Sequence, residues 1–330
     1  MLAASIGVEA VGAADIPVIA RWRGGKKAAV SYTFDDGMEN QYTEAFPKMK
    51  ELGLRGTFFI NGGPVDRASP TRQGAKRMTW TMVAEMAKAG QEIGCHGYEH
   101  RNHGRSTEAA IEADILSNRV AIVKATGSAP ITYAYPNNAK NREWSAALLK
   151  RLGFVGSRTR QISLGGKRDL KSADKLIADA KAKGEWLVTM THGISEGYDR
   201  VGDPAKWFYA HLEHTAADPD VWVAPFAEVA IYEALRDHTK ISPVKTATGW
   251  QLNLTPPDLD PKLYRGTLDI LFPDGHLETI DPFNDSTNRS DLLVDADTRR
   301  GQSPEKWGQS TDKDRIWELD EIMVDNSRIL

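Results

Sequence analysis

The stretch that decides the fold is residues 28–37, which read AAVSYTFDDG. Six of its first seven residues are apolar or β-prone, which is typical of a strand buried on both faces. Asp35 and Asp36 then close this strand, and adjacent carboxylates in such a place are costly unless a cation or a proton offsets their charge. Gly37 permits a bend that would bring both carboxylates to one site. The competing interpretation is an ordinary Asp-Gly surface turn.

The same strand begins a long alternation of short apolar runs and helical patterns that continues to Thr239. Repeated units of this kind predict a parallel sheet with helices outside it, and seven strands in this length suit a barrel better than an open sheet. The predicted strands are 28–34, 55–60, 92–96, 131–135, 154–157, 186–191 and 221–224. The predicted helices are 38–53, 80–89, 107–126, 142–151, 170–183, 206–217 and 227–237.

The regions on either side differ in character, so we predict three segments: a tail over 1–25, an α/β barrel over 26–240 and a β-rich appendage over 241–330. In the appendage, Pro273-Asp274-Gly275 reads as a tight turn between strands at 266–272 and 276–280. Residues 1–14 are small and apolar, which predicts the remnant of a secretion signal and a secreted or periplasmic protein. They lack the positive residues of a complete signal, so a disordered tail is the alternative.

Composition narrows the classes of function. The chain has 330 residues, of which 41% are hydrophobic and 26% charged, with a net charge of −3, as expected of a folded globular protein. That charge gives no basic patch for nucleic acid, and no apolar run is long enough for a membrane span. Cys95 is the single cysteine, which excludes an intramolecular disulfide.

Histidines supply the remaining candidates for chemistry. His96 and His100 flank Gly97-Tyr98-Glu99 directly after a predicted strand, and two histidines at this spacing can converge on one metal. His103 lies nearby and is interpreted as a surface residue or a residue beside the metal ligands. His192 ends the strand Thr189-Met190-Thr191 and can act as a general acid or base. With the acidic pair, this set is complete for metal-assisted hydrolysis of an acyl bond.

These motifs resemble those of the polysaccharide deacetylases, carbohydrate esterase family four, over roughly Lys26 to Thr239. The resemblance implies an incomplete (β/α) barrel and assigns Asp35 as the general base. It makes Asp36, His96 and His100 the ligands of a divalent ion. Zinc is the expected ion, and cobalt, nickel and manganese suit the same donors.

The later motifs match in part. The stretch Tyr133-Ala134-Tyr135-Pro136-Asn137 stands where the family's third motif is expected, and His192 matches the general acid of the last motif. The third motif commonly begins with an arginine that tethers the base, but Ala134 stands there, and the Asp-Trp fourth motif is not visible. Arg158, after the next strand, is a candidate for the missing guanidinium, with an ordinary surface arginine as the equal alternative.

We therefore expect a metal-dependent hydrolase that removes N- or O-acetyl groups from a carbohydrate polymer or oligomer. Tyr135, Pro136, Asn137 and Trp80 are the candidate substrate contacts. Two alternatives stay open: an amidohydrolase acting on a small cyclic imide or ureide, and a carbohydrate-binding protein with a retired active site. The sequence leaves the oligomeric state undecided.

Overall fold

The computed structural model describes residues 15–71, 73–139 and 142–284. The segment that predicts export, residues 1–14, lies outside these ranges. So does the part of the predicted appendage after residue 284. Within the described residues, no helix is both long enough and apolar enough to cross a membrane.

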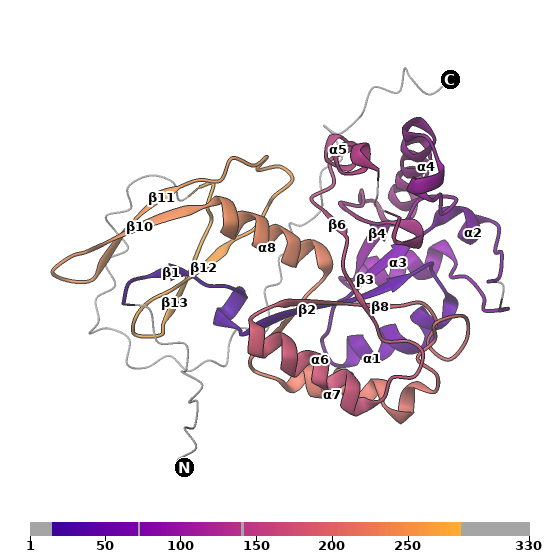
Figure 1. The fold of residues 1–330 in the computed structure, drawn as a ribbon, viewed down its shortest axis with the longest axis horizontal. Helices are drawn as coiled ribbons and strands as arrows, with labels where there is room; N and C mark the ends of the chain where they lie inside the picture. Colours follow the sequence, from indigo (N-terminus) through magenta and orange to yellow (C-terminus); the bar gives the residue numbers. More distant parts are fainter. Residues whose placement is uncertain (1–14, 72, 140–141, 285–330) are drawn as a thin grey trace, which may run out of the picture.

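A parallel sheet forms the centre of the molecule (Figure 1). Its order is β6-β5-β4-β3-β2-β8-β7, and β9 also pairs with β2. The strands are β2 (Ala28–Asp35), β3 (Thr57–Ile60), β4 (Glu92–Cys95), β5 (Thr132–Ala134), β6 (Gly156–Arg158), β7 (Ile162–Ser163), β8 (Trp186–Thr191) and β9 (Val221–Val223). No pairing joins β6 to β7 in the described part of the chain, so the sheet stays open at that seam. The predicted incomplete barrel is confirmed.

Helices cover the outside of this sheet. They are α1 (Phe46–Glu51), α2 (Gly62–Asp66), α3 (Trp80–Lys88), α4 (Glu108–Thr126), α5 (Glu143–Arg151), α6 (Leu170–Lys183), α7 (Phe208–Ala217) and α8 (Phe226–His238). Local chemistry sets their ends: Asp169 caps the start of α6 in a reciprocal capping box, and Gly184 ends it in the left-handed region. The predicted helix over 38–53 is present as a helical run over 39–51, in which a π-helical turn over Gln41–Ala45 precedes α1.

The main core lies between the sheet and helices α1, α3, α6 and α7. Every residue of β2 is buried, as its apolar sequence predicts. The two-residue strand β7 and the five-residue helix α2 are not among the predicted elements, because segments so short carry no readable periodicity.

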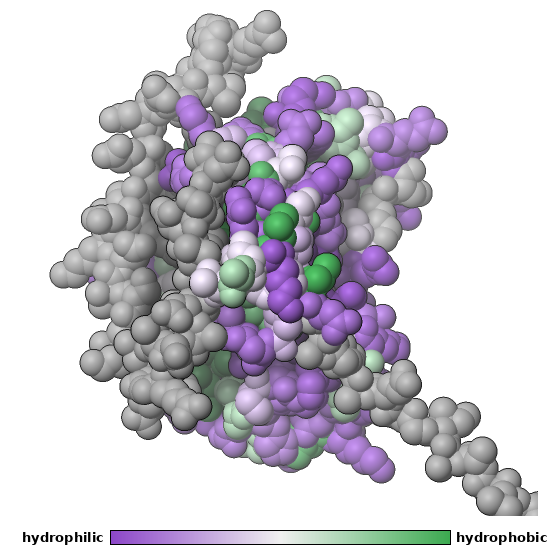
Figure 2. Space-filling model, turned by 90° about the vertical axis from the view of Figure 1, so that its left-hand side faces the viewer, coloured by the Kyte–Doolittle hydropathy of each residue, from purple (hydrophilic) through white to green (hydrophobic). Residues whose placement is uncertain are grey.

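A second core joins α8 to the appendage. The predicted hairpin is present as β12 (Leu268–Leu271) and β13 (Leu277–Ile280), and β1 (Val18–Ile19) pairs with β12. A second hairpin consists of β10 (Lys240–Lys245) and β11 (Trp250–Thr255). Part of the predicted N-terminal tail therefore pairs with the appendage. Figure 2 views the molecule from this end, where the described surface is mainly hydrophilic with a few separate hydrophobic side chains.

Candidate active site

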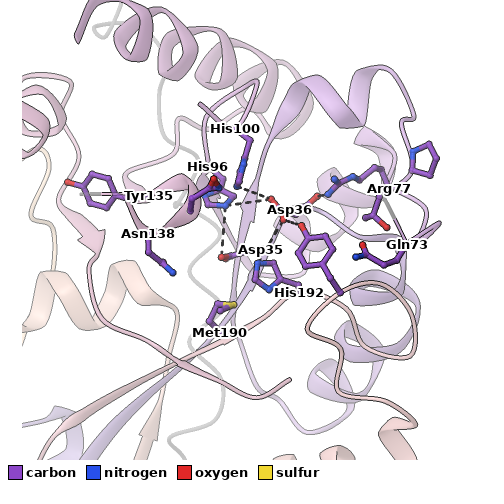
Figure 3. Close-up of a pocket in the computed structure, with 14 residues that line it drawn as sticks. Asp35, Asp36, Gln73, Arg77, His96, His100, Tyr135, Asn138, Met190 and His192 are labelled. Atoms are coloured by element: carbon purple, nitrogen blue, oxygen red, sulfur yellow. Dashed lines mark hydrogen bonds and ion pairs between the residues drawn. The ribbon is translucent and has the colours of Figure 1, made fainter. Parts of the chain in front are cut away.

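The acidic pair lies where β2 ends. Asp35 is the last residue of the strand, and Asp36 has a φ of 73°. The left-handed turn therefore begins at Asp36 and continues at Gly37, whereas the sequence alone attributes it to the glycine. Arg77 caps this turn by donating a hydrogen bond to the carbonyl oxygen of Asp36. The turn brings both carboxylates to one cavity, as Figure 3 shows.

Arg158 binds the first carboxylate with both terminal nitrogens. Its Nη1 lies 2.6 Å from Oδ1 of Asp35, and its Nη2 bonds Oδ2. The same Nη1 donates to the hydroxyl of Thr33 at 2.7 Å. Arg158 and Asp35 are each only 3% exposed. The guanidinium thus reaches Asp35 from β6, and the alternative of a surface arginine is wrong.

The charge of Arg158 decides the ionisation of Asp35. Burial alone would raise the pKa of this carboxyl, but the Arg158 guanidinium, assisted by His96, outweighs burial and lowers the pKa to about 2. Asp35 is therefore ionised at neutral pH and can accept a proton.

Asp36, His96 and His100 converge on one point. Oδ1 of Asp36 lies 3.6 Å from Nε2 of each histidine, and the three donor atoms all lie within 4.8 Å of one another. His96 is directed by its Nδ1, which is 2.8 Å from the carbonyl oxygen of Ala134 and leaves Nε2 facing the cavity. Burial lowers the pKa of His96 to about 4, so the imidazole is neutral, which is its metal-binding form.

This donor set fits a divalent ion. A carboxylate and two imidazoles are borderline-soft ligands suited to zinc and its first-row neighbours, and three protein ligands leave positions open for water or substrate. The hydrogen bond from His96 to a backbone carbonyl is the outer support that metal-bound histidines usually have. The structure thus brings the three predicted ligands together.

His192 follows the last residue of β8 and lies across the acidic pair from His96 and His100. Its Nδ1 is 3.2 Å from Oδ2 of Asp199, and its Nε2 is 4.0 Å from Oδ2 of Asp36. Burial disfavours the charged imidazole, but the hydrogen bond to Asp199 and the charges of Asp35 and Asp36 raise the pKa of His192 above its usual value. Asp199 itself is held by the hydroxyl of Ser163 at 2.8 Å.

The predicted substrate contacts divide into two groups. A cavity of about 590 Å³ is lined by Asp35, His192 and the three predicted metal ligands, and by Tyr135 and Asn137. Pro136 is buried and does not line the cavity. Trp80 does not line the cavity: it lies at the start of α3, where its indole nitrogen donates to Asp66 at 2.6 Å. The sequence around Trp80 has no pattern that distinguishes an aromatic residue in the cavity from one outside it.

Of the two interpretations of His103, a surface residue or a residue beside the metal ligands, the first is wrong. His103 is fully buried, with its Nδ1 2.9 Å from the hydroxyl of Ser145 and its Nε2 2.9 Å from the hydroxyl of Tyr133. Its environment is therefore a packed polar cluster, and burial lowers the pKa of His103 to about 4.

Half of the lining residues were not among the sequence-derived site candidates, and neither was Asp199 beside His192. The lining residues missed are Pro70, Thr71, Gln73, Arg77, Asn138, Met190 and Tyr198. Tyr198 and Asp199 belong to a loop that follows His192, where no periodicity marks a functional side chain. The usable pattern is the density of glycines in that loop, Gly193, Gly197 and Gly202, because glycines at such density accompany tightly folded loops.

The comparisons with known proteins agree with the family that the motifs resemble. Residues 23–156 match the family model described as polysaccharide deacetylase, the family that the motifs resemble. A peptidoglycan-N-acetylglucosamine deacetylase from Bacillus cereus is 25% identical over 196 residues, which are 50% of this chain and 67% of the relative. The resemblance inferred from the motifs is confirmed.

Solved structures support the fold. A Mycobacterium smegmatis protein provisionally described as a polysaccharide deacetylase has a TM-score of 0.50 and 18% identity, and the match covers 64% of this chain and 92% of that one. The Puue allantoinase has a TM-score of 0.51 and 12% identity with the same coverage. At these identities the likeness concerns the fold alone, so the choice between acetyl and ureide chemistry depends on the site.

Proposed function

We propose that the protein is a metal-dependent hydrolase that removes acetyl groups from a carbohydrate polymer or oligomer. The observation that carries this proposal is the assembly, in one cavity, of an ionised carboxylate, a three-donor metal site and a histidine on the far side. The match of residues 23–156 to the polysaccharide deacetylase family supports the choice of substrate.

Asp36, His96 and His100 would hold the ion. A divalent ion in this place would polarise the acetyl carbonyl and lower the pKa of water. Zinc is the proposed ion, because imidazole and carboxylate donors in a three-ligand set are typical of catalytic zinc.

The chain's own residues handle the protons. Asp35 accepts a proton from the attacking water, whose oxygen forms the new bond to the acetyl carbon. A backbone N–H near Asn137 donates a hydrogen bond to the developing oxyanion. As the bond from the acetyl carbon to the sugar nitrogen or oxygen breaks, His192 gives its proton to the leaving atom. The products are acetate and the free amine or alcohol.

Electrostatics support these roles. Asp35 is the carboxylate with the guanidinium partner, so it keeps its charge without a metal and is not needed as a ligand. His192 has a raised pKa because Asp199 and the acidic pair stabilise its protonated form, which an acid requires.

The test is acetate release from a panel of N- and O-acetylated glycans, measured together with metal content by elemental analysis. We expect one divalent ion per chain and release from at least one glycan. His100→Ala should lose both metal and activity. His214→Ala is the matched control, because His214 is an exposed histidine that contacts Asp174 outside the cavity. Equal metal content in the wild type and His100→Ala would overturn the site.

A further inference from the structure

The loop over residues 193–202 has an unusually constrained conformation. Its backbone closes on itself: the Gly193 amide donates to the carbonyl of Tyr198 at 3.3 Å, and the Gly202 amide donates to the carbonyl of Ile194 at 2.9 Å. Asn40 ties the loop to the barrel by donating to the carbonyl of Glu196 at 3.0 Å. The loop is therefore built as a fixed support for the side chains it carries.

Glycines with no room for a side chain make this conformation possible. A Cβ on Gly193 would lie 1.8 Å from the carbonyl oxygen of Glu196, and one on Gly165 would lie 2.0 Å from the carbonyl oxygen of Asp199. Asp199 itself has a φ of 44°, a conformation that is costly for a residue with a side chain. The surrounding contacts hold that strain, and strain of this kind concentrates at functional sites.

Tyr198 is the residue that this loop directs at the proposed metal ligand. Its hydroxyl donates a hydrogen bond to Oδ2 of Asp36, and its ring packs 4.7 Å from the ring of His192. The other oxygen of Asp36, Oδ1, faces His96 and His100 and also accepts from the amide of Asn61 at 3.1 Å. The two oxygens of this carboxylate therefore have separate surroundings, one among the metal donors and one at the tyrosine.

We propose that Tyr198 is a positioning residue that fixes Asp36 for metal binding and so sets the affinity of the site for its ion. This inference rests on the proposed metal-dependent function. A carboxylate free to rotate about its last bond presents either oxygen or both, whereas a hydrogen bond to Oδ2 keeps Oδ1 toward the histidines. Loss of such an outer hydrogen bond typically weakens metal binding about 10- to 100-fold.

The experiment is a zinc titration of the metal-stripped full chain in competition with a chromophoric chelator. Tyr198→Phe removes only the hydroxyl, and we expect its Kd for Zn²⁺ to rise about 10- to 100-fold. Tyr42→Phe is the control, because its hydroxyl bonds Glu85 on α3, outside the cavity. An unchanged Kd in Tyr198→Phe would overturn the inference.

A second variant separates the hydroxyl from the loop. Asp199→Asn perturbs the same loop at its contact with His192 but touches neither oxygen of Asp36. We expect it to bind Zn²⁺ as the wild type does. If it weakens binding as much as Tyr198→Phe, the loop as a whole is responsible and the inference is wrong. A wild type that binds no better than Asp36→Asn would instead overturn the proposed function, and the role of Tyr198 with it.

Discussion

Replacing Arg158 with alanine tests the electrostatics of the site most directly. The change leaves Asp35, which is 3% exposed, without either of its bonds to the guanidinium. Removing one partner of a buried ion pair typically costs about 3–5 kcal/mol, because the remaining charge stays buried. We expect a loss of that size in the free energy of unfolding at pH 7.

The loss should depend on pH in a defined direction. The wild-type carboxyl has a pKa of about 2, below its usual 3.8, so its contribution of roughly 2.5 kcal/mol is present above pH 4 and disappears as the pH falls through 2. In Arg158→Ala, burial without the guanidinium raises this pKa above its usual value. As the pH falls, Asp35 is therefore protonated in the variant before it is protonated in the wild type, which removes the buried unpaired charge. The difference in the free energy of unfolding between the two proteins should narrow as the pH falls from 7 toward 4.

The assay is urea unfolding of the metal-free protein across this pH range. Arg151→Ala is the matched control, because Arg151 also pairs with carboxylates, those of Glu108 and Glu112, but is 54% exposed. Its loss should cost under about 1 kcal/mol. The double variant Asp35→Asn/Arg158→Ala should regain part of the lost stability. A loss below 1 kcal/mol for Arg158→Ala, or a difference that stays constant with pH, would refute this reasoning.

Three further predictions concern other parts of the chain. His192→Ala should lower kcat/KM about 10²- to 10⁴-fold on an N-acetyl substrate and clearly less on an activated acetyl ester, because an amine needs protonation to leave; equal losses would contradict an acid role. His103→Gln should make the free energy of unfolding less sensitive to acid. The buried imidazole has a pKa of about 4, so the unfolded chain takes up a proton at a higher pH than the folded chain does. The wild type should therefore lose about 2 kcal/mol of its free energy of unfolding between pH 7 and pH 5 because of this residue. Urea unfolding at both pH values checks this, and the same loss in both proteins would count against it. A chain ending at Lys240 should keep the parallel sheet but expose the apolar face of α8, so we expect a lower melting temperature and binding of a hydrophobic dye; an unchanged melting temperature would show that the second core contributes little.

Much of the barrel was predictable because its strands carry strong local patterns. The seven predicted strands are all present, since each combines an apolar run with β-prone residues. The convergence of Asp35, His96 and His192 was predictable for a related reason: parallel strands bring their carboxyl ends to one edge, so residues that directly follow such strands meet. Arg158 could be proposed as the partner of Asp35 because it ends β6, the strand that follows β5 in the sequence.

The features that escaped prediction depend on distant partners. The burial of His103 requires the hydroxyls of Ser145 and Tyr133, about 30 to 40 positions away, and no local pattern encodes such a match. Tyr198 and Asp199 reach the site through loop geometry that glycines permit but do not specify. Trp80 shows the opposite error, because residue type alone suggested a sugar contact where the structure has a hydrogen bond to Asp66.

The pairing of β1 with β12 has a consequence for synthesis of the chain. Val18 and Leu271 are neighbours in one small sheet, yet about 250 positions separate them along the sequence. At a translation rate of about 5–20 residues per second, β1 waits on the order of 10 to 50 s before its partner leaves the ribosome. During that interval it is an unpaired strand beside a folding barrel. Because β1 is only two residues long, it offers other chains a very short edge. A strand that waits unpaired for so long is therefore too short to pair stably with another chain.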